Sequence, residues 1–181
     1  MVKRLAVLVL VVVAGVGLYL FQPWRLVTTR TANDVLLVPT GTSAPAAAPT
    51  AVPTAVPTAV PSAVPPAVPV ALASGPFRSL EHATTGSATL VRLPGGGHVV
   101  QFEALATSDG PDLYVYLSDK KSDSAESAFG SGFTSLGKLK GNQGNQVYEI
   151  PSQMAVDSVR SVVIWCQRFS AGFAVAPLER G

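Results

Sequence analysis

The sequence predicts an all-β domain, an antiparallel β-sandwich of about seven to eight strands, behind an N-terminal transmembrane helix and a disordered Pro-rich linker. Three observations support this organisation. Leu5–Phe21 is apolar and carries no charge. The stretch 50–69 repeats proline at every fourth position. From Phe77 onward, short β-prone segments alternate with turn signals and show no helical periodicity.

The composition describes one domain of ordinary size. The chain has 181 residues, of which 48% are hydrophobic and 13% charged. The basic residues Lys3, Arg4, Arg25 and Arg30 lie around the apolar run, and the remainder is nearly neutral. We therefore predict no nucleic-acid surface. A single cysteine excludes an intramolecular disulfide framework.

The apolar run Leu5–Phe21 is long enough to cross a bilayer at the short end of the usual range, because a helix of this length spans roughly 25 Å. We predict that residues 1–24 form an uncleaved signal-anchor in the cell membrane, single-pass, with the C-terminal domain outside the cytoplasm. The alternative is a cleaved signal peptide with Leu5–Val13 as its core. Continuation of the apolar run past Gly17 argues against cleavage.

A juxtamembrane segment, residues 25–49, and a linker, residues 50–76, follow. Val35–Val38 is apolar, but the sequence does not indicate where it packs. Proline at every fourth position forbids a helix and a sheet ladder. We expect an extended polyproline-like tract of roughly 60 Å over its five repeats. Its expected role is a stalk that holds the domain, residues 77–179, away from the membrane.

Seven segments of the domain have the composition of strands. They are Ser87–Leu93, His98–Leu105, Asp112–Ser118, Thr134–Leu139, Gln146–Ile150, Ser161–Gln167 and Gly172–Leu178. Gly95–Gly97 predicts a turn between the first two, and Gly141–Asn145 predicts a hairpin loop between the fourth and fifth. Asp119–Gly132 is expected to be a long surface loop, and a short helix is expected between Pro151 and Asp157.

The segment that contains the cysteine is apolar on both sides. Val162, Ile164 and Cys166 share one face of a strand. Val163 and Trp165 share the other face. Such a strand belongs in the middle of a packed sheet. Cys166 therefore lies inside the core or at its edge.

Several motifs recur in an order typical of one family. They are His82 with Gly86, Gly110–Ser118, Leu136–Pro151, Ser161–Phe169 and Phe173–Leu178. Together these motifs resemble the DM-thirteen domain family, which occurs in bacterial membrane-anchored proteins and beside DOMON domains in animal Skeletor-like proteins. The resemblance covers roughly Phe77–Leu178 and implies a β-sandwich.

The resemblance implies a role in extracytoplasmic electron transfer. The cysteine of the family's Trp-Cys motif is the proposed redox thiol or haem ligand, and the matching residue is Cys166. His82 lies at a family motif and is the second candidate for holding a haem b. Because the sequence carries no DOMON or cytochrome module of its own, this hypothesis needs a separate cytochrome or redox partner protein.

The residues themselves leave two interpretations of Cys166 open. A free cysteine commonly packs as a small, inert hydrophobe. A lone thiol in an exported protein, however, risks oxidation, so a cysteine without a role is less expected there. Gln167 and Arg168 follow directly, so the strand can reach solvent beside a guanidinium that favours thiolate. His98 adjoins a glycine turn and is expected to be exposed.

Other chemistry finds little support. Asp109 and Asp112 are candidates for calcium, or else cap a tight turn before a strand. Zinc-ligand spacing, a covalent haem-attachment motif, a nucleophile elbow and a phosphate-binding loop are absent from the sequence. We therefore expect a non-catalytic redox accessory protein. The alternative is a stalked binding module at the cell surface, in which Cys166 is a core residue.

Overall fold

A computed structural model describes residues 2–21, 28–38 and 68–178. The elements in chain order are α1 (Val2–Phe21), β1 (Thr31–Asn33), β2 (Val70–Pro76), β3 (Arg78–Ser79), β4 (Thr85–Arg92), β5 (His98–Ala106), β6 (Leu113–Ser118), the 3-10 helix η2 (Glu126–Gly130), β7 (Phe133–Lys138), β8 (Gln143–Ile150), the 3-10 helix η3 (Val156–Ser158), β9 (Ser161–Cys166) and β10 (Ala171–Pro177). The domain is thus mostly β, as the sequence predicts.

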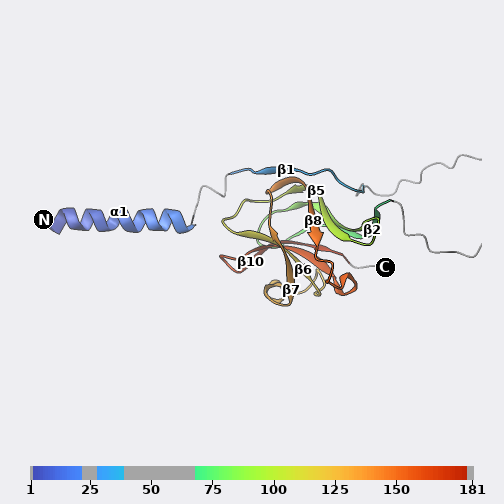
Figure 1. Cartoon of the computed structure of the whole chain (residues 1–181). Coiled ribbons are helices and arrows are strands. Elements are labelled where there is room, and N and C mark those ends of the chain that lie inside the picture. The colour runs from blue at the N-terminus through green and yellow to red at the C-terminus, as the bar shows by residue number, and fades with distance from the viewer. Residues whose placement is uncertain (1, 22–27, 39–67, 179–181) are drawn as a thin grey trace, which may run out of the picture.

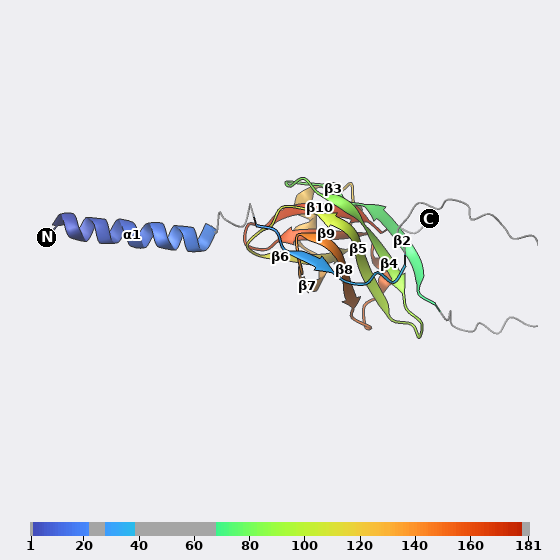
Figure 2. The same cartoon turned by 90° about the horizontal axis from the view of Figure 1, so that it is seen from above.

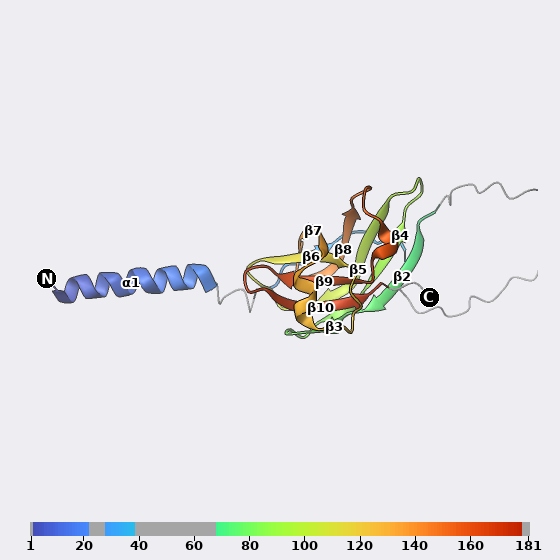
Figure 3. The same cartoon turned by 90° about the horizontal axis from the view of Figure 1, so that it is seen from below.

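The strands form two packed sheets. Sheet A has the order β1-β8-β5-β4-β2, and sheet B has the order β3-β10-β9-β6-β7. Figure 1 shows the two layers, and Figures 2 and 3 show them from above and from below. Neighbouring strands are antiparallel except β1 and β8, which are parallel. The predicted sandwich is therefore confirmed, with more strands than expected.

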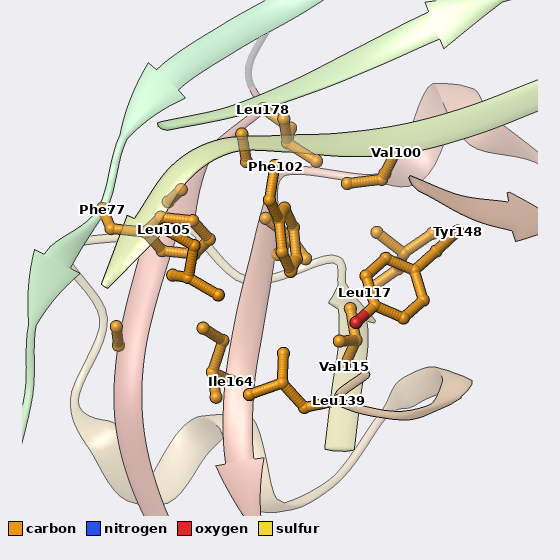
Figure 4. Packing of buried hydrophobic residues seen from close by; sticks show 14 of the residues in the cluster. Phe77, Val100, Phe102, Leu105, Val115, Leu117, Leu139, Tyr148, Ile164 and Leu178 are labelled. Carbon is orange, nitrogen blue, oxygen red and sulfur yellow. The ribbon is translucent and has the colours of Figure 1, made fainter. Parts of the chain in front are cut away.

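Side chains from both sheets interlock between the layers. The ring of Phe102 lies edge-on to Phe77, with the ring centroids 5.1 Å apart, and tilted against Tyr148 at 5.3 Å. From sheet B, Leu117 and Ile164 point into the same space (Figure 4). All five belong to one core cluster of buried residues. Removal of their apolar surface from water is the main stabilising contribution to the sandwich.

Strand β9 is buried on both faces, as its alternation predicts. Val162, Ile164 and Cys166 belong to the core between the sheets. Val163 and Trp165 belong to a second apolar cluster on the outer face of sheet B. A central position between β6 and β10 provides the backbone partners for such a strand. The two-faced interpretation of this segment is confirmed.

All seven predicted strands are present, with ends shifted by a few residues. The predicted turn at Gly95–Gly97 joins the antiparallel strands β4 and β5. The predicted hairpin at Gly141–Asn145 is wrong, because β7 pairs with β6 in sheet B whereas β8 pairs with β5 in sheet A. The connection crosses between the sheets. In place of the short helix expected before Asp157, a 3-10 turn forms at Val156–Ser158.

The predicted boundary between linker and domain needs correction. Strand β2 lies within the stretch predicted as linker, and β1 lies within the juxtamembrane segment. Both strands belong to sheet A. The chain on either side of the proline repeat is therefore part of the same domain. The repeat connects two points of one sandwich, so it cannot act as the spacer between α1 and the domain; most of the repeat itself lies outside the described residues.

The N-terminal helix α1 forms over the predicted apolar run. Most of its large apolar side chains are exposed, among them Leu10 and Tyr19. Within the stretches 2–21, 28–38 and 68–178, no helix meets the length and hydropathy expected of a membrane span. The expectation of a transmembrane helix is not supported by this finding.

The packing of β9 predicts the effect of truncating Ile164, which is fully buried. Replacing Ile164 by Ala is expected to lower the free energy of unfolding by about 2–5 kcal/mol, because it removes buried methyl groups and leaves a cavity. Urea unfolding followed by circular dichroism measures this loss. The control Lys121→Ala, at an exposed position, should stay within about 0.5 kcal/mol of wild type. Equal midpoints for Ile164→Ala and wild type would contradict the assigned core.

Candidate functional site

A short segment before the proline repeat lies on sheet A. We name residues 28–38 the docked segment. Its central strand β1 adds to the edge of β8, with Thr31 opposite Gln143 and Asn33 opposite Asn145. The amide of Asp34 donates to the carbonyl of Asn145 at 2.9 Å. The docked segment thereby supplies the partners that an edge strand otherwise lacks.

Asp109 is the most enclosed carboxylate at this site. Its side chain is 1% exposed, and one oxygen accepts a 2.7 Å hydrogen bond from the guanidinium of Arg30. The hydroxyl of Thr28 donates to the other oxygen at 2.9 Å, and the amide of Gly110 also donates to the carboxylate. Losing the partner of a fully buried charge costs about 3–5 kcal/mol. Because Arg30 is 43% exposed, we expect a smaller loss here.

A second polar side chain, Asn142, connects the docked segment to the turn before Asp109. Its amide group donates to the carbonyl of Thr107 at 2.9 Å, and its carbonyl oxygen accepts from the amide of Arg30 at 2.6 Å. The hydroxyls of Thr107 and Thr84 lie 2.7 Å apart. Since Thr84, Thr107 and Asn142 are buried, this network holds the turn in one arrangement.

The C-terminal half of the docked segment binds the outer face of β5. The side-chain oxygen of Gln101 accepts from the amides of Leu37 and Val38, and its amide group donates to the carbonyl of Val38. Alternation along this strand predicts that Gln101 lies on the solvent side. Its complete burial is instead explained by the docked segment, which covers it.

An ion pair fixes the middle of the docked segment. Lys140 donates to the carboxylate of Asp34, which also accepts from the amide of Val147 at 2.9 Å. The hydrogen bond from Lys140, followed by that from Val147, holds the pKa of Asp34 below its ordinary value. The docked arrangement therefore favours the ionised carboxylate.

Two glycines leave room for the docked segment. A Cβ on Gly141 would collide with the carbonyl oxygen of Arg30, and a Cβ on Gly144 would collide with that of Ala32. Gly144 also has a φ of +95°, which favours glycine. These residues, whose composition predicts a hairpin, serve the close approach of a second backbone.

The docked segment also forms one wall of a hollow with a volume of about 350 Å³. Thr28 and Thr29 line it from the segment, and Asp109 and Asn142 line it from the domain. A smaller hollow of about 100 Å³ lies beside Arg30 and contains Lys138. Both are lined largely by polar or charged groups, which suits small polar molecules better than a large apolar cofactor.

Cys166 lies inside the core rather than at its edge. Its thiol is free, and the residue is 0% exposed. Leu113 of β6 and Ala171 of β10 flank it in the sheet. Gln167, the next residue, is exposed, so the strand reaches solvent directly after the cysteine, as predicted. A thiol in apolar surroundings is a poor nucleophile.

His82 lies at the same end of the sandwich as Cys166. Its ring stacks on Phe173, with the centroids 3.8 Å apart, and Phe173 belongs to the core cluster that contains Cys166. His82 is half-buried. His98, also half-buried rather than exposed as predicted, begins β5 at the opposite end of the β4–β5 ladder.

The residues around Cys166 do not fit a haem. A Cβ on Gly110 would lie 3.0 Å from both Leu113 and Phe173, so this end of the core is filled by side chains. The stacked Phe173 covers one face of the His82 ring. A macrocycle between Cys166 and His82 would have to displace these side chains.

The alternative calcium site at Asp109 and Asp112 is also disfavoured. Asp109 is engaged by Arg30, and Asp112 pairs with Lys138 at 3.2 Å. Among the described residues, no three His, Cys, Asp or Glu side chains gather as a metal site would require. Asp109 caps the amide of Gly110, as the turn interpretation predicts.

Aromatic side chains cover the outer face of sheet B beside Cys166. Tyr116 stacks on Phe133 at 3.7 Å, and Trp165 belongs to the same cluster. Burial raises the pKa of Tyr116, so its phenol stays protonated at neutral pH. The indole ring lies under exposed Gly130 of η2, where an added Cβ would be 3.4 Å from the ring. We call Tyr114, Tyr116, Phe133 and Trp165 the aromatic cluster.

Comparison with known families agrees with the resemblance seen in the sequence. The profile described as electron transfer DM13 matches residues 76–178, more than half of the chain. The chain belongs to the DM13 family. No curated protein and no solved structure matches it.

The DM13 region contains Cys166, the aromatic cluster and the domain side of the polar site. The docked segment and all of β2 except Pro76 precede it. Sequence reasoning misses the contribution of Arg30 to the site because Arg30 lies 79 residues before Asp109. The positive charge of Arg30 and the apolar run Val35–Val38 are visible in the sequence, but neither indicates which residues it contacts in the fold.

Burial of Cys166 predicts its reactivity. Iodoacetamide added to the native full-length protein is expected to leave Cys166 unmodified, whereas the same reagent in denaturant should label it completely. Mass spectrometry counts the label, and a control peptide that contains a free cysteine verifies the reagent. Labelling of the native protein at the rate of the peptide would show that the thiol is accessible.

The lowered pKa of Asp34 predicts that the domain loses stability at acid pH. Since this pKa is lowered in the folded state, the contribution of Asp34 is complete above the unfolded value, about 3.9, and is lost as pH falls through the lower folded value. Between about pH 4 and pH 2, urea stability should therefore fall less steeply in Asp34→Asn than in wild type. The uncharged, exposed Gln153 provides the control, and Gln153→Ala is expected to retain the wild-type slope. Identical slopes for wild type and Asp34→Asn would refute the assignment.

Proposed function

We propose that the protein is a non-catalytic accessory component of an extracytoplasmic electron-transfer system, with Cys166 as its oxidisable thiol. Membership of the DM13 electron-transfer family supports the general role. The observation that carries the specific proposal is the position of Cys166 next to Trp165, whose ring lies beneath Gly130. One peptide bond thus connects a core thiol to an aromatic ring near the surface.

Burial limits the chemistry to the exchange of single electrons. A protein with one cysteine forms no internal disulfide, and an enclosed thiol cannot attack the disulfide of a partner without opening the core. In the proposed step, Cys166 gives one electron to an oxidised partner and its proton to bulk water, which leaves a sulfur radical. The reverse transfer from a reduced partner, with uptake of a proton, restores the thiol. Trp165 provides the intermediate ring.

The proposed partner is a separate cytochrome or another one-electron redox protein. It would bind over η2, where Gly130 lies against the ring of Trp165. The role as a haem ligand, which the family resemblance also implied for Cys166 with His82, receives no support from the packing. The proposal therefore places any haem in the partner.

We further propose that α1 attaches the protein to the cell membrane and that the domain lies outside the cytoplasm. The exposed apolar side chains of α1 support the attachment. Six residues, 22–27, separate α1 from the docked segment. They span at most about 25 Å, so the domain would stay close to the membrane surface. Fractionation of cells tests the attachment. The full chain is expected in the membrane fraction, and removal of residues 2–21 should release it.

A second function, that of an interaction module, is favoured by a different observation. The edge of β8 binds an extended segment through both backbone and side chains. In this hypothesis Cys166 only fills the core. The two functions differ in what happens when Cys166 is removed, because only electron transfer needs its sulfur.

Titration with a one-electron oxidant such as hexachloroiridate tests the redox role. Cys166→Ala in the full chain is expected to give up about one electron fewer per molecule than wild type, because the variant lacks the thiol. Trp165→Phe should slow the oxidation of Cys166 several-fold without changing its extent. Trp24→Phe provides the matched control. Equal electron counts for Cys166→Ala and wild type, with both folded by circular dichroism, would leave the interaction module as the function.

A further inference from the structure

The edge of β8 and the turn at Asp109 carry a polar surface that the electron-transfer proposal does not use. We name it the β8-edge groove and define it by Gln101, Asp109, Lys140, Asn142 and Gly144. We propose that the β8-edge groove is a peptide-binding site and that its ligand is the docked segment of the same chain, held in cis. This inference does not rest on the proposed electron transfer.

The mode of binding is strand addition. In strand addition an extended peptide pairs with an exposed sheet edge, so that backbone hydrogen bonds provide affinity and side-chain contacts provide specificity. β1 pairs with β8 over three residues, and the amide of Gln143 donates to the carbonyl of Arg30 at 3.2 Å. The remainder of the docked segment is held by side chains of the groove.

Three buried side chains of the groove take their partners from the docked segment. The carboxylate of Asp109 accepts from Thr28 and Arg30. The carbonyl of Asn142 accepts from the backbone of the segment. Gln101 binds the last two residues of the segment in both directions, as donor and as acceptor. Three separate positions along one peptide are thus recognised.

The groove is also shaped for a second backbone. Gly141 and Gly144 lack the Cβ atoms that would collide with the docked segment at Arg30 and Ala32. At Gly141 the nearest atoms to such a Cβ all belong to the docked segment. An added methyl group at Gly141 would therefore collide first with the docked segment and not with the rest of the domain.

The ligand and the site are separable parts of the chain. The groove lies within the DM13 region, residues 76–178, whereas the docked segment precedes it. The 29 residues 39–67 connect the two. A covalent connection makes binding of the segment intramolecular, which favours it over the same segment of a second copy. The occupant is therefore the segment of the same chain rather than that of a second copy.

The test uses the full chain with a protease recognition sequence inserted within residues 39–67. The probe is a fluorescent peptide with the sequence of residues 28–38, and the readout is fluorescence polarisation. Before cleavage the groove is filled in cis, so the probe should not bind. After cleavage the probe should bind by exchange with the N-terminal piece, and unlabelled peptide should displace it.

Two variants make the test specific. A probe peptide carrying Arg30→Ala leaves the domain unchanged and is expected to bind about a hundred-fold more weakly, because Asp109 loses its counterion. Gly141→Ala in the domain should reduce probe binding by at least as much. The matched control Gly97→Ala should bind like wild type, because its Cβ would lie 3.6 Å from its nearest neighbour, the side chain of Leu93.

Three results would overturn the inference. The first is that the probe fails to bind the cleaved, folded protein, and the second is that the Arg30→Ala probe binds as well as the wild-type probe. The third is that uncleaved copies with different tags purify together and that Gly141→Ala abolishes this association. The occupant would then be the segment of a second copy, by strand exchange, rather than the segment held in cis.

Discussion

Strand β9 buries all six of its side chains, and a strand of this kind requires cover on both faces. Sheet A covers one face, where Ile164 packs among residues of both layers. The aromatic cluster and η2 cover the other, where Phe129 is buried against the sheet. The order β10-β9-β6 follows, because only a central position satisfies the backbone on both sides. The layered architecture of the domain depends on this strand.

Sheet A is completed by hydrogen bonds and an ion pair rather than by apolar packing. Its outer face presents buried polar groups, and the docked segment supplies hydrogen bonds to Gln101 and Asn142 and a cation to Asp109. Specificity comes from the cost of leaving such groups unpaired, which exceeds the net gain from forming their bonds. A short strand of three residues therefore achieves a defined register on β8. The same contacts bring Thr28 and Thr29 to the hollow beside Asp109.

The location of Cys166 bears on the redox role that we propose for it. Enclosure in the core removes access for covalent chemistry. Adjacency to Trp165 retains a short route to the surface, since neighbouring side chains of a strand point to opposite faces. A buried thiol next to an aromatic ring near the surface suits electron exchange with a bound protein better than it suits thiol exchange. The polar site at Asp109 instead serves the peptide binding that we propose for the edge of β8.

The sequence by itself determined seven of the ten strands in the described residues, the two faces of β9 and the family, because alternation and motif order are local properties that a single segment displays. It did not determine which strands pair. Gly141 and Gly144 have the composition of a hairpin, yet they lie at a crossing between sheets and admit the docked segment. Nor could the ion pair of Arg30 and Asp109 be predicted, because 79 residues separate them and charge patterns carry no information on distant partners. Only tertiary packing decided that the chain before the proline repeat returns to the domain, where it covers Gln101 and provides hydrogen-bond partners to Asp109 and Asn142.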